Sequence, residues 1–173
     1  MNAAYSVSAH YDGGFDVGDL EAWASGLRNQ FTGEEISLGF VFVTPPFFDN
    51  AAELLEILRV HARIPLLIGC SSGGLIANAQ ELEKDSGVVL SLHHLPKASL
   101  KAIHFTQEQV EQGDTEGFWR EETEVSDRNG WLVFADPFQI NAEQWLEQWN
   151  TNWPFVPVLG GLASGSQQQQ RTQ

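Results

Sequence analysis

Hydrophobic and polar residues alternate at the start of the chain and then change to a helical spacing. Residues 5–11 alternate between apolar and polar side chains, which predicts a strand with one polar face. Gly13 and Gly14 interrupt this pattern. Behind Asp16, apolar residues recur every three or four positions, which predicts a helix over residues 16–29.

Two later segments, residues 39–74 and 130–165, align with each other without a gap at an offset of 91 residues. Nine of the 36 aligned pairs are identical, namely Gly39/Gly130, Pro46/Pro137, Phe47/Phe138, Asn50/Asn141, Ala51/Ala142, Leu55/Leu146, Glu56/Glu147, Gly69/Gly160 and Gly74/Gly165. Each segment runs from an apolar stretch through a Pro-Phe turn and an amphipathic helix to a second apolar stretch. This order is typical of a βαβ unit, so the sequence predicts the same unit twice.

The helix of each segment has a predicted start and a predicted buried stripe. Asn50 and Asn141 are followed three residues later by Glu53 and Gln144, a pattern typical of helix N-caps. The predicted buried stripes consist of Ala51, Leu54, Leu55 and Leu58 in one helix and of Ala142, Trp145, Leu146 and Trp149 in the other. Second strands are expected over residues 64–68 and 155–159, each ending in a glycine loop, 69–74 or 160–165. The tryptophans at 131, 145, 149 and 153 are interpreted as core, with a ligand cage as the alternative.

Between the two segments, residues 87–95 and 99–105 read as two strands joined around Pro96, which predicts a hairpin. Residues 106–129 are acidic and are expected to form a solvated connection with some helix. The predicted fold is therefore α/β, with a mixed sheet, two duplicated βαβ units and an intervening β-hairpin. We expect one domain over residues 1–173.

Composition excludes several classes of function. The 173 residues include 23 acidic and 9 basic side chains, a formal net charge of −14, which disfavours nucleic acid and anionic lipid surfaces as partners. No apolar stretch approaches the length of about 18 residues that a membrane helix requires, so no membrane insertion is expected. A single cysteine and the absence of any Asn-x-Ser/Thr sequon favour a cytoplasmic location.

The loop at residues 69–74 carries the candidate chemistry. Its glycines suggest a phosphate site, but Gly74 is followed by Leu75 and Ile76 rather than by the Lys-Ser/Thr of a P-loop. Cys70 lies at the end of a predicted strand, where it is either a small residue or ligand contact, or a nucleophile. The bases available to a nucleophile are His93, His94 and His104, and the aligned partner of Cys70 is Gly161.

Cofactor signals are weak. His93 and His94 are adjacent on a predicted strand, so their side chains point to opposite faces and cannot readily bind one metal ion together. No other Cys or His pair has ligand spacing. We therefore expect no metal and no cofactor.

Parallel strands place their carboxyl ends at one edge of a sheet, where ligands of open α/β sheets bind. The residues predicted at that edge are Thr44, Cys70, Ser71, Ser72, Asp136, Gly160, Gly161 and Ser164. Glycine amides and serine hydroxyls can hold a carboxylate, and Asp136 can hold an amine. The sequence therefore predicts a site for a small polar metabolite, the alternative being that these residues only form tight turns.

Three motifs together resemble the N-terminal domain of FIST proteins: Gly69-Cys70-Ser71-Ser72-x-Gly74, the strand and hairpin of residues 88–105, and the run Leu159-Gly160-Gly161-Leu162-Ala163-Ser164. The resemblance covers the chain from Tyr5 onward. It implies a sensory domain of signal transduction that binds small ligands such as amino acids, without an established catalytic activity. FIST proteins normally continue into a C-terminal FIST domain, so we expect this domain to be incomplete at its C-terminus or to act through a separate signalling output protein.

Two other classes of function remain open. One is a thiol-dependent hydrolase or transferase that uses Cys70 as its nucleophile. The other is a protein-interaction module, because the resemblance includes family members linked to F-box modules.

Overall fold

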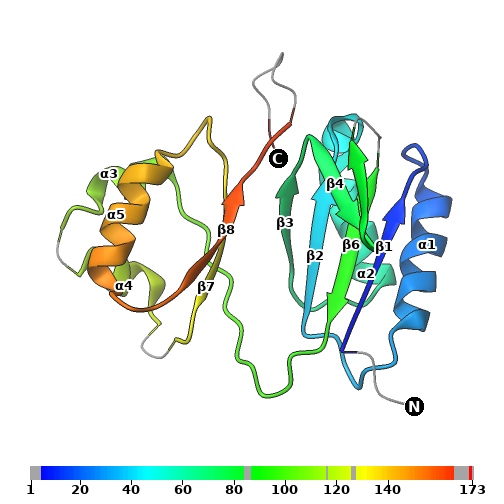
Figure 1. Ribbon diagram of the computed structural model, residues 1–173, viewed down its shortest axis with the longest axis horizontal. Coiled ribbons are helices and arrows are strands. Elements are labelled where there is room, and N and C mark those ends of the chain that lie inside the picture. Colours follow the sequence, from blue (N-terminus) through cyan, green and yellow to red (C-terminus); the bar gives the residue numbers. More distant parts are fainter. Residues whose placement is uncertain (1–4, 84–86, 116, 126–127, 166–171, 173) are drawn as a thin grey trace. The chain divides into compact units, whose positions relative to one another are not determined.

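A computed structural model describes residues 5–83, 87–115, 117–125, 128–165 and 172 of the chain (Figure 1). The chain divides into two compact units. The first unit comprises residues 1–100 and 164–173, and the second comprises residues 101–163. Most of the C-terminal segment after Gly165 lies outside the described residues.

The first unit is built on a sheet of four strands, and this sheet is mixed, as predicted. The strands are β1 (Ser6–Tyr11), β2 (Leu38–Val43), β3 (Leu67–Ser71) and β6 (Val88–His93), in the order β1-β6-β2-β3. Strand β6 runs antiparallel to both β1 and β2, whereas β2 and β3 are parallel (Figure 1). The sheet therefore has β1 and β3 at its two edges.

Two helices supply the core on one face of this sheet. They are α1 (Val17–Gln30) and α2 (Ala51–His61), and a 3-10 helix, η1 (Pro45–Asn50), leads into α2. Asp16 starts α1, because its carboxylate accepts a hydrogen bond of 2.9 Å from the Asp19 amide. Buried residues of both helices, Leu20 and Leu58 among them, belong to the same hydrophobic core as Leu90 of β6.

A β-hairpin covers part of the opposite face. It consists of β4 (Gly74–Ala77) and β5 (Gln80–Glu83), joined by the two-residue turn Asn78-Ala79. Leu75 and Ala77 of the hairpin pack against Val89 of β6. The end of β3 therefore leads directly into a hairpin that is anchored on its own sheet.

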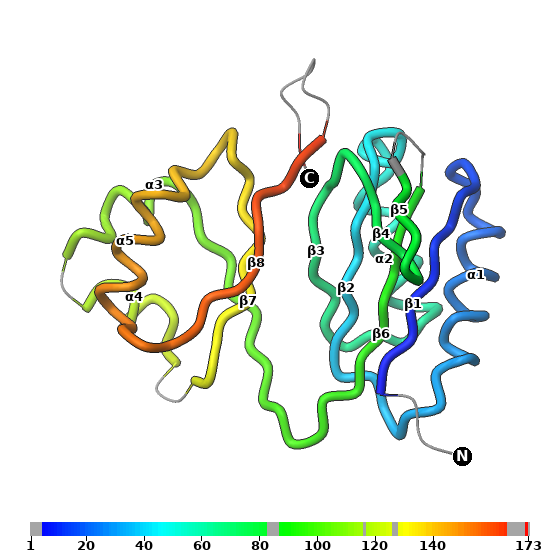
Figure 2. Tube along the Cα trace, in the orientation of Figure 1, coloured from blue at the N-terminus to red at the C-terminus, as the bar shows by residue number. Residues whose placement is uncertain are grey.

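Among its described residues, the second unit contains two parallel strands and three helices. Its elements are α3 (Gln107–Gln112), α4 (Phe118–Thr123), β7 (Trp131–Ala135), α5 (Ala142–Asn152) and β8 (Val158–Leu162) (Figure 2). Its core consists of Val110, Trp119, Trp145, Trp149 and Trp153, with Trp131 packed against them. The interpretation of the tryptophans as core is therefore confirmed.

The predicted hairpin at residues 87–105 is wrong. Residues 88–93 form β6, but residues 99–105 form no strand. Both edges of β6 are occupied, by β1 on one side and β2 on the other, so this sheet leaves no edge of β6 for a following strand. The hairpin between the two βαβ segments is instead β4–β5.

The predicted helix faces and strand limits also need correction. Leu55 and Leu146 are each 41% exposed, because the buried arcs are centred on Leu54, Ile57 and Leu58 and on the corresponding residues of α5. Strands β3 and β8 start three residues later than predicted. Four of the six residues of the first predicted glycine loop and three of the six residues of the second are therefore in strands, and only residues 72–73 separate β3 from β4.

One of the two predicted N-caps is confirmed. The Asn141 side chain accepts a hydrogen bond of 3.1 Å from the Gln144 amide at the start of α5. Asn50 makes no such capping bond, because the chain is already helical in η1 before α2 begins.

The register of the strands shifts the repeat alignment by one residue. In the parallel pairs, Val41 lies opposite Gly69 and Val133 lies opposite Gly160. The second strands and the helices correspond at an offset of 91 residues, but the first strands correspond at an offset of 92. Residues 44–50 and residues 136–141 link strand to helix, so the second segment has one residue fewer at this point.

Candidate functional site

In the first unit, β2 and β3 end side by side because they are parallel. Val43, the last residue of β2, lies opposite Ser71, the last residue of β3. Thr44 follows β2, and Ser72 and Gly73 follow β3 before the hairpin begins. The carboxyl ends of these two strands therefore form one edge, as predicted.

Thr44 is held in a buried clamp with Gly87. The Thr44 hydroxyl donates to the Gly87 carbonyl at 3.1 Å and accepts from the Gly87 amide at 2.8 Å. The side chain is 2% exposed. Thr44 thus ties the end of β2 to the start of β6, and both roles of its hydroxyl are already used.

The residues after β3 form a closed turn. The Ser72 amide donates to the Val43 carbonyl at 2.8 Å, and the Ser72 hydroxyl bonds the carbonyl oxygen of Gly74. The Gly74 amide is 3.4 Å from the Ser72 hydroxyl oxygen. These amides donate within the chain, so the turn does not offer a phosphate the row of amide donors found in a P-loop.

Ser164 joins this turn. Its amide donates to the Ser71 carbonyl at 3.0 Å, and its hydroxyl oxygen accepts from the Gly73 amide at 2.9 Å. The first unit therefore brings together Ser71, Ser72 and Ser164, three of the predicted site residues. We call the pair of hydrogen bonds between Ser164 and residues 71–73 the Ser164 clasp.

Cys70 is half-buried on β3, opposite Phe42 of β2. Burial raises the pKa of the Cys70 thiol above its ordinary value of 9.0. The thiol is therefore protonated near neutral pH, which suits a packing or ligand contact better than a nucleophile.

His93 lies on the same sheet and bonds a neighbour on its own strand. Its Nε2 atom lies 3.0 Å from the Ser91 hydroxyl, and burial lowers the pKa of the imidazole below its ordinary value of 6.5. Among the residues that the structure describes, no group of three His, Cys, Asp or Glu side chains is placed to hold a metal ion.

The other predicted site residues, Asp136, Gly160 and Gly161, belong to the second unit. The Asp136 carboxylate accepts hydrogen bonds from the Phe138 amide at 2.9 Å and from the Gln139 side-chain amide at 2.7 Å, which closes the turn after β7. Gly160 and Gly161 lie within β8. A joint site made of residues from both units stays a prediction.

Sequence reasoning missed two glycines at the edge described above. Gly87 is the partner of Thr44, and a Cβ on it would overlap the His10 imidazole and the Tyr11 carbonyl. Gly73 supplies the amide that Ser164 accepts. Their partners are 43 and 91 positions away in sequence, so no local pattern marks them.

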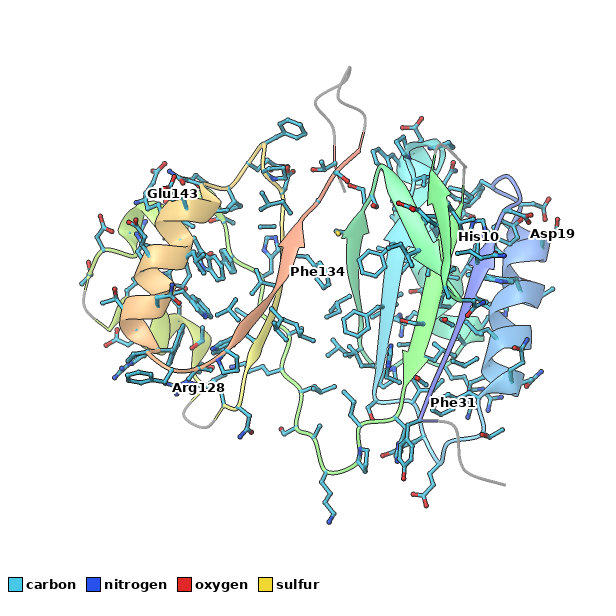
Figure 3. The ribbon with its side chains drawn as sticks, in the orientation of Figure 1. His10, Asp19, Phe31, Arg128, Phe134 and Glu143 are labelled. Carbon is cyan, nitrogen blue, oxygen red and sulfur yellow. The ribbon has the colours of Figure 1, made fainter. Side chains whose placement is uncertain are left out.

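In the second unit, cationic side chains serve the internal structure. The Arg128 guanidinium lies over the Trp153 ring, 5.1 Å from the ring centroid. Arg128 is labelled in Figure 3. Arg120 donates two hydrogen bonds to the Asn152 carbonyl, which ends α5. Lys101 donates to the Thr123 carbonyl at 2.8 Å. These three residues stabilise helix ends and the aromatic core.

The protein-family model of the FIST N domain matches residues 37–173 of the chain. The chain belongs to the FIST N domain family. Membership in this family implies a sensory domain of signal transduction. No solved structure matches the chain. Among the described residues, no helix is both long and apolar enough to cross a membrane.

Curated relatives of this FIST N domain come from mycobacteria. An uncharacterized protein of Mycobacterium tuberculosis is 26% identical over 142 residues, and an uncharacterized protein of Mycobacterium bovis is 27% identical over 142 residues. Each match covers 82% of this chain and 36% of the relative. The chain thus spans about a third of the length of these relatives.

Proposed function

We propose that this FIST N domain senses a small polar ligand, an amino acid for example, at the carboxyl ends of β2 and β3 in the first unit. Ligand binding would be read out by a separate signalling output protein in the cytoplasm. Family membership supports the sensory role, and the single cysteine supports the location. The geometry at the end of β3 supports the placement of the site.

The observation that carries the placement is the cluster at the end of β3. The Ser71 carbonyl and the Gly73 amide, an acceptor and a donor, are close enough to bond the same residue, Ser164. The half-buried Cys70 thiol lies one residue before this pair. A polar ligand with both a donor and an acceptor would match such a pair, and the carboxyl ends of parallel strands are the usual place for it.

The competing proposal of a thiol-dependent enzyme has less support. A nucleophilic cysteine needs a lowered pKa or an adjacent base. Burial instead raises the pKa of Cys70. We therefore favour binding without catalysis.

Calorimetric titration of the standard amino acids into the wild-type chain and into a Cys70→Val, Ser72→Ala double variant tests this proposal. We expect the double variant to bind at least about tenfold more weakly, because a contact and a turn-forming hydrogen bond are lost. Ser6→Ala on β1, at the opposite edge of the sheet, is the matched control and should bind as the wild type does. Equal binding by a folded double variant would place the site elsewhere.

A further inference from the structure

We propose that Ser164 is an internal occupant of the candidate site and that a ligand binds there by displacing it. This inference rests on the proposed function, since it concerns how the same site is regulated. It assigns a role to the Ser164 clasp that the family assignment does not contain.

The clasp has the form of a ligand contact. Ser164 presents one donor, its amide, to the Ser71 carbonyl at 3.0 Å and one acceptor, its hydroxyl oxygen, to the Gly73 amide at 2.9 Å. The main-chain groups of residues 71 and 73 therefore recognise a serine by two atoms at once. A free molecule with the same donor and acceptor would satisfy the same two groups.

The clasp is exposed at Ser164 and Gly73, although Ser71 itself is only 1% exposed. Ser164 and Gly73 are both solvent-exposed, whereas Thr44 is buried and bonds both main-chain groups of Gly87. Hydrogen bonds between exposed groups can be exchanged for bonds to water or to a solute at little cost, but buried polar groups cannot lose their partners cheaply. Ser164 is therefore the replaceable partner at this edge, and Thr44 is the fixed one.

The geometry defines a ligand class. The ligand must donate to the Ser71 carbonyl and accept from the Gly73 amide. An α-amino acid meets this requirement, because its ammonium group donates while its carboxylate or side-chain hydroxyl accepts. L-Serine carries the same donor and acceptor as the residue that it would replace.

Displacement of Ser164 would convert ligand binding into a conformational change of the chain at residue 164. Ser164 is the residue at which the chain re-enters the first unit after the second. A ligand in the clasp position would keep the Gly73 amide bonded but would leave the Ser164 amide without its Ser71 acceptor. Occupancy of the site would thus be reported as release of the chain at residue 164.

Ser164→Ala, which removes the acceptor of the clasp, is the test variant, and Ser99→Ala, at another exposed serine of the first unit, is its matched control. L-Serine is titrated into both variants and into the wild-type chain. We expect Ser164→Ala to bind L-serine about fivefold more tightly, because the loss of one net hydrogen bond weakens the competitor by that factor. Ser99→Ala should bind as the wild type does.

Amide hydrogen exchange followed by NMR supplies a second readout on the wild-type chain. Saturating L-serine should speed exchange of the Ser164 amide while the Gly73 amide stays protected. Equal affinities for Ser164→Ala and wild type, or an unchanged Ser164 amide in the bound state, overturn the displacement. If another amino acid binds and L-serine does not, recognition of the ligand as a substitute for Ser164 is overturned and the sensory function stands. If no amino acid binds any of these proteins, the proposed function fails together with the inference.

Discussion

Gly69 lies so close to its cross-strand partner Val41 that a Cβ atom on Gly69 would overlap the Val41 carbonyl oxygen. Gly160 stands in the same relationship to Val133 in the second unit. Two separate parallel strand pairs thus share an unusually close backbone approach at the same position. This shared contact supports the predicted duplication. It also requires a gap of one residue in the alignment of the two segments. With this gap, Val41 corresponds to Val133 and Phe42 to Phe134.

Gly160→Ala should destabilise the second unit. Its φ angle is +150°, which disfavours side chains, and a Cβ would meet the backbone of Val133. We expect a loss of about 1 to 3 kcal/mol in the free energy of unfolding, measured by urea denaturation. Gly161→Ala is the control, because a Cβ there meets no atom within 4 Å. Equal effects of the two substitutions would contradict the close approach.

Ala79→Gly should stabilise the first unit. Asn78 and Ala79 have φ angles of +49° and +65°, as the central residues of a type I′ hairpin turn do. Glycine adopts this conformation without the steric cost that alanine carries, so a gain of about 1 kcal/mol is expected in urea denaturation. Ala77→Gly, in the adjoining strand, should instead destabilise. A loss of stability in Ala79→Gly would rule out this turn geometry.

Gln148→Ala should destabilise the aromatic core of the second unit. The Gln148 side chain accepts from the Trp119 indole at 3.1 Å and donates to the Val110 carbonyl at 2.9 Å. Its removal leaves buried polar groups unpaired, at a cost of about 1 to 3 kcal/mol. Unfolding followed by tryptophan fluorescence measures the change. Asn150→Ala, at an exposed position of the same helix, should hardly change the free energy of unfolding. A similar loss of stability in Asn150→Ala would contradict the assignment of the Gln148→Ala effect to lost hydrogen bonds.

The Cys70 thiol should react slowly with iodoacetamide near neutral pH. Burial raises its pKa in the folded chain, so the thiolate fraction is smaller than in the urea-unfolded chain. The rate should rise with pH as the thiolate fraction rises, and it should level off at a higher pH in the folded chain than in the unfolded chain. Because the folded-state pKa is the higher one, the stability that this group contributes is present at low pH and is lost as the pH rises through the unfolded and then the folded value. Faster alkylation of the native chain than of the unfolded chain at pH 7 would instead favour the enzyme hypothesis.

Local patterns predicted several of the helices and strands but not the hairpin β4–β5, and pairing between distant segments decided which strands lie side by side. The helix behind Asp16, the cap at Asn141 and the burial of Trp145 follow from spacing within a few residues, and the structure confirms them. The exposure of Leu55 and Leu146 depends on where the core meets each helix, which helical spacing fixes only to within one position.

At the candidate site, too, the sequence predicted some features and not others. The carboxyl ends of β2 and β3 meet as expected from the βαβ pattern, because parallel strands require it. The partners of Thr44 and Ser164 could not be predicted, since Gly87 and Gly73 are brought to them by the folding of distant segments. The sequence therefore indicated which residues lie at the edge but not which of them are already bonded there.

Equilibrium dialysis of the native chain against a mixture of polar metabolites that includes the standard amino acids tests the central claim most directly. Compounds enriched on the protein side are identified by mass spectrometry. The account predicts that at least one amino acid is enriched by the wild-type chain and by Ser6→Ala, and that the Cys70→Val, Ser72→Ala variant loses this enrichment. Enrichment of no compound, or equal enrichment by the folded double variant, would contradict a ligand site at the ends of β2 and β3.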